Sequence, residues 1–174
     1  MRRMLKNWLK KDCGVVAVEF AMIALPFFTL LLGTVEVSLF YASAVVLEGA
    51  SESAARLVRT GQAVDSGDPE TAFKNRLCDM VKALIPCADI KYEAMKMGTG
   101  TFTEAQGKTP QYNASGQLVP SGFDAGDASD VVMIRASYYY NFALPFIGTL
   151  VTGGQGNAVP MTSTVVIKNE PYKF

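Results

Sequence analysis

The sequence predicts an α+β protein, in which a long N-terminal transmembrane helix continues into a small extracytoplasmic domain with a second helix and an antiparallel sheet of about three strands. Three observations predict this fold: an apolar run over residues 15–41, an amphipathic helical pattern over 68–86, and three strand-like stretches in the second half of the chain. The 174 residues allow one compact domain plus one long element. An apolar fraction of 49% excludes a disordered chain.

The basic residues are concentrated at the amino terminus, although the whole chain is neutral with 16 basic and 16 acidic residues. The leader, residues 1–14, carries Arg2, Arg3, Lys6, Lys10 and Lys11 against the single acid Asp12. A nucleic-acid-binding protein spreads such residues over a folded face, so this pattern predicts membrane orientation and no nucleic-acid partner. Positive residues resist translocation. We therefore expect a single-pass protein of the bacterial inner membrane, with a cytoplasmic leader and a periplasmic C-terminal domain.

The apolar run 15–41 contains only two charged residues, Glu19 and Glu36. As a helix it would be ~40 Å long, more than the ~30 Å that a bilayer core requires. We therefore expect membrane lipid to surround it. A cleaved secretory signal is disfavoured because its apolar core is usually only ~7–15 residues long. A buried core helix is disfavoured because the chain is too short to surround it.

The helix is predicted to continue beyond the membrane, so that residues 15–61 form a transmembrane and projecting helix. Residues 42–60 contain no proline, and Gly61 suits the left-handed conformation that ends many helices. Pro26 lies inside the span, where it removes a backbone hydrogen-bond donor, and we expect it to bend the helix. A stripe at three- and four-residue spacing is expected to pack against the outer domain; it consists of Ala50, Ala54, Leu57 and Val58.

The most informative segment is 13–20, Cys-Gly-Val-Val-Ala-Val-Glu-Phe, because it places the carboxylate of Glu19 inside an apolar helix. An acid at mid-bilayer costs about 2.5 kcal/mol or more unless it is compensated. Cleavage after Gly14 would create an amino group on Val15, about one helical turn from Glu19 or facing the Glu19 of a neighbouring helix. Alternatively, Glu19 lies close enough to the boundary to reach water, or is protonated.

This arrangement of a basic leader, a glycine, four apolar residues, a glutamate and an aromatic residue resembles the type IV prepilin processing site. The resemblance implies that a prepilin peptidase cuts after Gly14 and leaves Val15 as the new amino terminus. It also implies that Glu19 guides subunit assembly and that Phe20 occupies the position of the following aromatic residue. Phe20 replaces the tyrosine common in pilin subunits of this kind, which removes one hydroxyl.

Three segments, 14–26, 54–63 and 163–171, resemble the TadE-like family, whose members are pseudopilins or minor pilins of the tight-adherence (Tad, Flp, type IVb) pilus. The resemblance implies a role in assembly of this pilus for surface adherence. It also implies partners: the prepilin peptidase, other pilin or pseudopilin subunits, and Tad assembly components. The mature chain would enter the pilus or remain in the inner membrane with the apparatus.

Residues 62–174 are predicted to form the extracytoplasmic α+β domain. Asp68, Pro69 and Glu70 form a helix opening, and Pro86 ends the helix. The apolar residues at helical spacing between them are Phe73, Leu77, Met80, Val81 and Leu84. Strands are expected at 90–97, 131–142 and 158–168. One face of the last strand would carry Met161, Ser163, Val165 and Ile167.

Cys78 and Cys87 lie in the part predicted to be periplasmic, where disulfides persist, and we expect them to be bonded. Within one helix their Cα atoms would be ~13.5 Å apart, beyond the ~7 Å limit for a disulfide, so the chain must turn back near Pro86. A catalytic thiolate or a metal-binding pair is the alternative, but the sequence contains no histidine.

No catalytic, cofactor or metal site is predicted, because histidine is absent and the acids are scattered over loops and helix faces. A membrane-anchored enzyme is thus disfavoured. The acids Asp124, Asp127 and Asp130 recur at every third residue and could collect calcium, which keeps open a membrane-anchored periplasmic ligand- or calcium-binding protein. They lack the closer alternation and the bidentate glutamate of a calcium loop, so a solvated loop is favoured.

Two further features could face partners. The connection 98–129 is long and polar, so we expect either a mobile binding loop or partial disorder. The apolar block 142–151 lies in a turn-rich region between the last two strands. We expect it to cover the domain's own core; the alternative is an exposed patch for the membrane or a neighbouring subunit.

Overall fold

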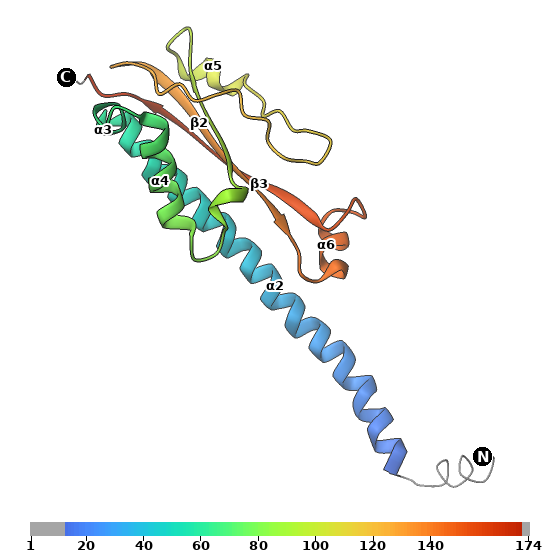
Figure 1. Ribbon diagram of the computed structural model, residues 1–174. Coiled ribbons are helices and arrows are strands. Elements are labelled where there is room, and N and C mark those ends of the chain that lie inside the picture. The colour runs from blue at the N-terminus through green and yellow to red at the C-terminus, as the bar shows by residue number, and fades with distance from the viewer. Residues whose placement is uncertain (1–12, 172–174) are drawn as a thin grey trace. The chain divides into compact units, whose positions relative to one another are not determined.

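The computed structural model describes residues 13–171, and these fall into two compact units divided between Ser38 and Leu39. The predicted leader, apart from its last two residues, lies outside the described residues. Helix α2 (Cys13–Arg59) supplies all of the described first unit and the beginning of the second (Figure 1). The predicted end of this helix is confirmed, because Gly61 follows it with a φ of 76°, in the left-handed region that glycine adopts without strain.

In the first unit, α2 exposes large apolar side chains on all sides, with exposed fractions between 37% for Val37 and 75% for Leu30. Its hydroxyl groups are satisfied within the helix: Thr29 donates to the Leu25 carbonyl at 2.8 Å, and Ser38 donates to the Thr34 carbonyl at 2.7 Å. Within residues 13–171, α2 is the one helix long and apolar enough to cross a membrane. Such a surface suits lipid far better than water.

The second unit is built on a three-stranded antiparallel sheet with the order β1-β2-β3. The strands are β1 (Lys91–Lys96), β2 (Val131–Asn141) and β3 (Ala158–Lys168). Each lies inside one of the stretches predicted from alternation and β-branched content, and β3 has the predicted bounds. The α+β fold with a long apolar helix and a three-stranded antiparallel sheet is therefore confirmed.

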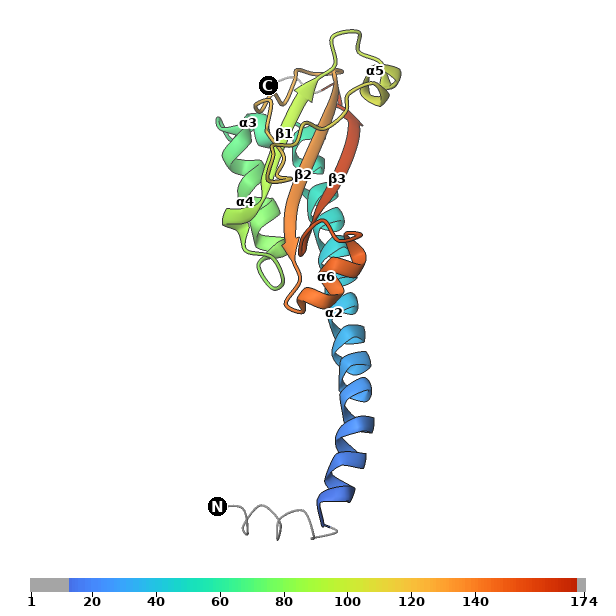
Figure 2. The same cartoon turned by 90° about the vertical axis from the view of Figure 1, so that its right-hand side faces the viewer.

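Helices cover one face of this sheet, as Figures 1 and 2 show: the part of α2 after Ser38, then α3 (Gln62–Asp65) and α4 (Pro69–Val81). The predicted stripe on α2 packs there, with Ala50, Ala54 and Val58 at 0% exposure and Leu57 half-buried against the same core. Helix α4 begins as predicted, since Asp68 accepts a hydrogen bond from the Thr71 amide at 3.1 Å and Pro69 follows it. The sheet residues of this main core are Ala94, Val132, Ile134, Ala136 and Met161, with Val165 and Ile167 at its edge.

The opposite face of the sheet is covered by the connection between β1 and β2. This segment contains α5 (Phe102–Gln106), whose Ala105 joins Met97, Val131 and Met133 in a second, smaller core. The segment returns along β1, where the Ala94 amide donates to the Gly122 carbonyl at 3.1 Å. The connection expected to be mobile or partly disordered therefore has a defined path across the sheet.

The connection between β2 and β3 contains α6 (Pro145–Val151), and it divides the apolar block into two parts. Phe142 is buried at 3% exposure and stacks on Phe40 with the ring centroids 5.3 Å apart. Phe146 and Leu150 on α6, by contrast, are each 63% exposed. The expectation of a core cover therefore holds in part: Phe142 and Gly148 are buried, Leu144 and Ile147 are half-buried, and the outer face of α6 is exposed.

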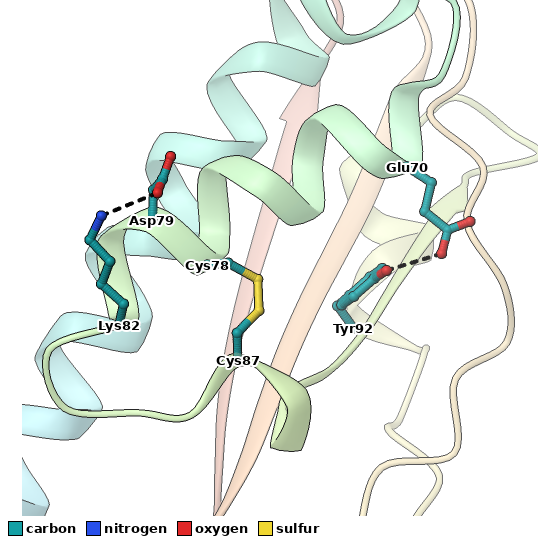
Figure 3. Close-up of a disulfide and its surroundings, with 6 residues drawn as sticks. All are labelled: Glu70, Cys78, Asp79, Lys82, Cys87 and Tyr92. Carbon is teal, nitrogen blue, oxygen red and sulfur yellow. Dashed lines mark hydrogen bonds and ion pairs between the residues drawn. A yellow bond between two sulfur atoms is a disulfide. The ribbon is translucent and has the colours of Figure 1, made fainter.

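Cys78 on α4 and Cys87 in η1 (Cys87–Asp89) form the expected disulfide, with their Cα atoms 5.2 Å apart (Figure 3). At the other end of α4, the Tyr92 hydroxyl donates to Glu70 Oε1 at 3.1 Å. Burial, followed by this hydrogen bond and the Glu70 charge, raises the pKa of Tyr92 to about 12, so the phenol remains a neutral donor at physiological pH. Helix α4 is thus joined near its C-terminal end to η1 by the disulfide, and near its N-terminal end to β1 by the hydrogen bond between Glu70 and Tyr92.

Removing the disulfide by Cys78→Ser with Cys87→Ser should lower the free energy of unfolding by about 2–3 kcal/mol, because the bond closes a short loop across a separation of 9 residues. Urea unfolding of the full chain in detergent, followed by near-ultraviolet circular dichroism, measures the change. The matched control, Cys13→Ser, should leave the unfolding midpoint unchanged. Equal midpoints for all three proteins would show that the disulfide contributes nothing to stability.

Candidate functional site

The predicted processing motif occupies the first described turns of α2, where its side chains are open to the surroundings. Val15 is 57% exposed and Phe20 is 69% exposed. Gly14 is exposed, and a Cβ atom built on it would meet no heavy atom within 4 Å. Within the described structure, nothing in the packing or in the backbone conformation requires a glycine at this position. The identity of Gly14 therefore has no structural explanation within the fold.

Glu19 lies on the same open stretch of α2 and is exposed. Among residues 13–171 it makes no hydrogen bond and no ion pair. A carboxylate on an apolar helix surface needs a compensating group if that surface is surrounded by lipid. The helix itself brings Gly14, Val15, Glu19 and Phe20 into about two turns. The disulfide cysteines belong to the second unit.

A buried ion pair at the centre of the sheet was missed by the sequence analysis. Arg135 Nη1 donates to Glu93 Oε1 at 2.9 Å, and the two side chains are only 4% and 2% exposed. The residues are direct cross-strand partners on β1 and β2. Each is a charge inside an otherwise strand-like stretch, which is the signal that could have drawn attention to it. Their pairing depends on the strand register, which the sequence alone does not reveal.

This ion pair also holds the β1–β2 connection against the sheet. The second nitrogen of the guanidinium, Arg135 Nη2, donates to the Lys108 carbonyl. The second carboxylate oxygen, Glu93 Oε2, accepts from the Ser121 amide at 2.9 Å. The segment 108–121 is therefore fixed at both ends by partly buried, charge-assisted hydrogen bonds. The hydrogen bonds of this pair are all made within the domain, so its role is structural.

The acids that could have collected calcium are engaged by protein groups. The Lys96 ammonium lies between Asp127 Oδ2 and Asp130 Oδ2, at 3.1 Å and 2.6 Å. The hydrogen bond from Lys96 lowers the pKa of the Asp130 carboxyl below its usual range. Asp124 Oδ1 accepts from the Gly126 amide at 2.9 Å. Within the described part of the chain, no group of three or more His, Cys, Asp or Glu residues is placed to hold a metal ion.

Comparison with known proteins gives one family. A family model described as TadE-like protein matches residues 14–56. No curated protein and no solved structure matches the chain. The match begins at the glycine of the motif and continues through the buried stripe of α2 in the second unit. It confirms the resemblance to the TadE-like family over this segment, and the rest of the chain lies beyond it.

The buried pair predicts a non-additive effect on stability. Arg135→Met alone should lower the free energy of unfolding by about 3–5 kcal/mol, because it leaves the Glu93 carboxylate buried and uncompensated. The double variant Glu93→Leu with Arg135→Met should lose clearly less, since no charge remains buried. Urea unfolding measures both, and hydrogen exchange at the Ser121 amide should accelerate in the double variant because its acceptor is gone.

An exposed ion pair gives the matched control. Arg59 and Glu170 lie 3.5 Å apart with side chains 49% and 54% exposed, so Arg59→Met should cost no more than about 1 kcal/mol. If the costs of Arg135→Met and of Glu93→Leu simply added in the double variant, the two charges would not be coupled. Unchanged exchange at Ser121 would show that the pair does not hold the connection.

Proposed function

We propose that this TadE-like chain is a pseudopilin or minor pilin that acts in assembly of a Tad (Flp, type IVb) pilus for surface adherence. The observation that carries the proposal is the family match, which begins at Gly14, where the motif places processing, and follows α2 through both units. In this proposal the motif is the site of processing, and α2 is the surface that packs against other subunits during assembly. Helix α2 is long and apolar enough to serve as a single-pass membrane anchor.

The first step of the proposed function is cleavage of the Gly14–Val15 bond by a prepilin peptidase. Two observations support it. The bond lies at the amino-terminal end of the described helix, before the apolar run, and the fold gives Gly14 no steric reason to be glycine. A requirement for glycine is then explained by an enzyme that must approach this peptide bond closely.

The second step is packing of the mature helix against similar helices in the inner membrane. After cleavage, the amino group of Val15 supplies the positive charge that the exposed Glu19 carboxylate lacks among the described residues. The exposed apolar surface of the first unit supplies the contact area. The disulfide agrees with a periplasmic second unit, because disulfides persist in oxidising compartments. The leader would then be cytoplasmic, as its positive charge predicts.

Processing is tested by co-expressing the chain with a prepilin peptidase and sequencing the amino terminus of the membrane-bound product. The wild-type chain should begin at Val15, and Gly14→Ala should retain the leader. Gly49→Ala is a matched control, because Gly49 lies in the same helix and also has open space around its Cβ position. This variant should be cut like the wild type. An intact leader on the wild-type chain would remove the processing step.

The role of Glu19 is tested by Glu19→Gln, which removes the charge and keeps the shape. Membrane insertion should be unchanged, while cross-linking to neighbouring pilin-type subunits in the native host should fall roughly tenfold, the effect of losing a charge pairing of about 1.4 kcal/mol. Glu48→Gln, an exposed acid on the same helix in the second unit, is the control and should assemble normally. Normal assembly of Glu19→Gln would show that the carboxylate is incidental.

A further inference from the structure

Helix α6 presents an apolar surface that the proposed function does not use. Phe146 and Leu150 are each 63% exposed, and Val151 is 50% exposed. No Asp, Glu, Lys or Arg occurs between Arg135 and Lys168, so the whole β2–β3 connection is uncharged. An exposed cluster of this kind on a small domain marks a contact surface.

The outward direction of this surface is fixed by the opposite side of α6. Gly148 is buried, and a Cβ atom at this position would collide with the side chain of Asn157. Asn157 in turn donates from Nδ2 to the Phe142 carbonyl at 2.5 Å. Helix α6 is therefore held closely against its own connection through Gly148, and it displays Phe146 and Leu150 as a defined face.

The position of α6 in the second unit follows from the stacking of Phe142 on Phe40. Phe40 is the second residue of this unit, and the predicted membrane run 15–41 ends one residue later. Pro145, the first residue of α6, is three residues after Phe142, a reach of at most about 11 Å. Figures 1 and 2 show α6 at the end of the sheet where β2 ends and β3 begins. Chain connectivity thus places α6 next to the point where the apolar run ends.

We propose that α6 docks on the lipid bilayer interface through Phe146, Leu150 and Val151. Short apolar helices with an aromatic residue bind there by burying one face about 5–10 Å deep, and aromatic residues concentrate at this level. The closeness of α6 to Phe40, at the end of the apolar run, favours lipid over a second copy of the chain, because lipid around that end of the run would reach α6 without any partner. Tyr41, the last residue of that run, is a second exposed aromatic residue, at 64%. The proposal rests on the membrane anchoring that the proposed function also requires.

Docking by an uncharged surface has a distinctive chemical consequence. Because the β2–β3 connection carries no basic residue, its contact with lipid should depend neither on anionic headgroups nor on salt. This separates it from an electrostatic attraction of the domain to the membrane surface.

The test uses the full chain in phosphatidylcholine vesicles, with Trp8→Phe removing its single tryptophan. Into this background we would introduce Phe146→Trp on α6, Leu25→Trp in the span, or Phe102→Trp as the control. Phe102 is an exposed phenylalanine, at 53%, on α5 near the opposite end of β2, roughly 30 Å away. Quenching by lipids brominated near the headgroup or near the chain ends reports the depth of each tryptophan.

Phe146→Trp should be quenched roughly twofold by the shallow bromines and less by the deep ones, Leu25→Trp more by the deep ones, and Phe102→Trp by neither. Quenching of Leu25→Trp without that of Phe146→Trp would overturn the docking proposal and leave the membrane anchor intact. Blue-shifted but unquenched emission from Phe146→Trp would show a protein partner on α6 and overturn the proposal too.

The remaining outcomes are equally decisive. If Leu25→Trp were also unquenched, the membrane anchor itself would be wrong and the docking proposal would fall with it. If quenching of Phe146→Trp appeared only with anionic lipid, or disappeared in high salt, the contact would be electrostatic and the apolar docking would be refuted.

Discussion

The structure depends on one helix that carries two different apolar surfaces in succession. Before Ser38, large apolar side chains are exposed on all sides of α2, which is the pattern of a helix surrounded by lipid or by other helices. After Leu39, the apolar residues narrow to a stripe of small side chains, led by Ala50 and Ala54, on which the sheet packs. The TadE-like match over residues 14–56 includes both surfaces, so the family signature covers the anchor and the docking face of the domain together.

The sheet imposes a second constraint, because both of its faces must be covered and the longer helices α2 and α4 cover only one. The other face is covered by the β1–β2 connection, which offers few apolar anchors beyond Ala105 and Leu118. The Glu93–Arg135 pair compensates by binding the backbone of this connection at Lys108 and Ser121. Burying two charges has a cost, and it is offset here because the two side chains pair with each other and also make charge-assisted hydrogen bonds to the backbone of the connection.

The elements predicted correctly from the sequence are those specified by local signals. The cap at Asp68 and the alternation along β3 act within a few residues, so their positions follow from the sequence. The ion pair was missed because it depends on the register that brings Glu93 opposite Arg135, forty-two residues apart in the chain. The path of the connection 98–129 was missed for the same reason, since its polar composition indicated mobility while its anchors lie on distant strands. For the apolar block 142–151, the sequence did not show which residues are buried, because the burial of Phe142 depends on its contact with Phe40, about one hundred residues earlier in the chain.

The proposed processing motif is local to a single helix, and the structure distinguishes its residues from those that serve the fold. The identity of Gly61 is explained by its positive φ and that of Gly148 by its contact with Asn157. Neither reason applies to Gly14, and no partner among the described residues accounts for Glu19. Residues whose identity the fold does not explain are the ones that partners can explain. In this protein they are Gly14 and Glu19 on α2 and the exposed face of α6, and these are the residues on which the proposed processing, helix packing and membrane docking depend.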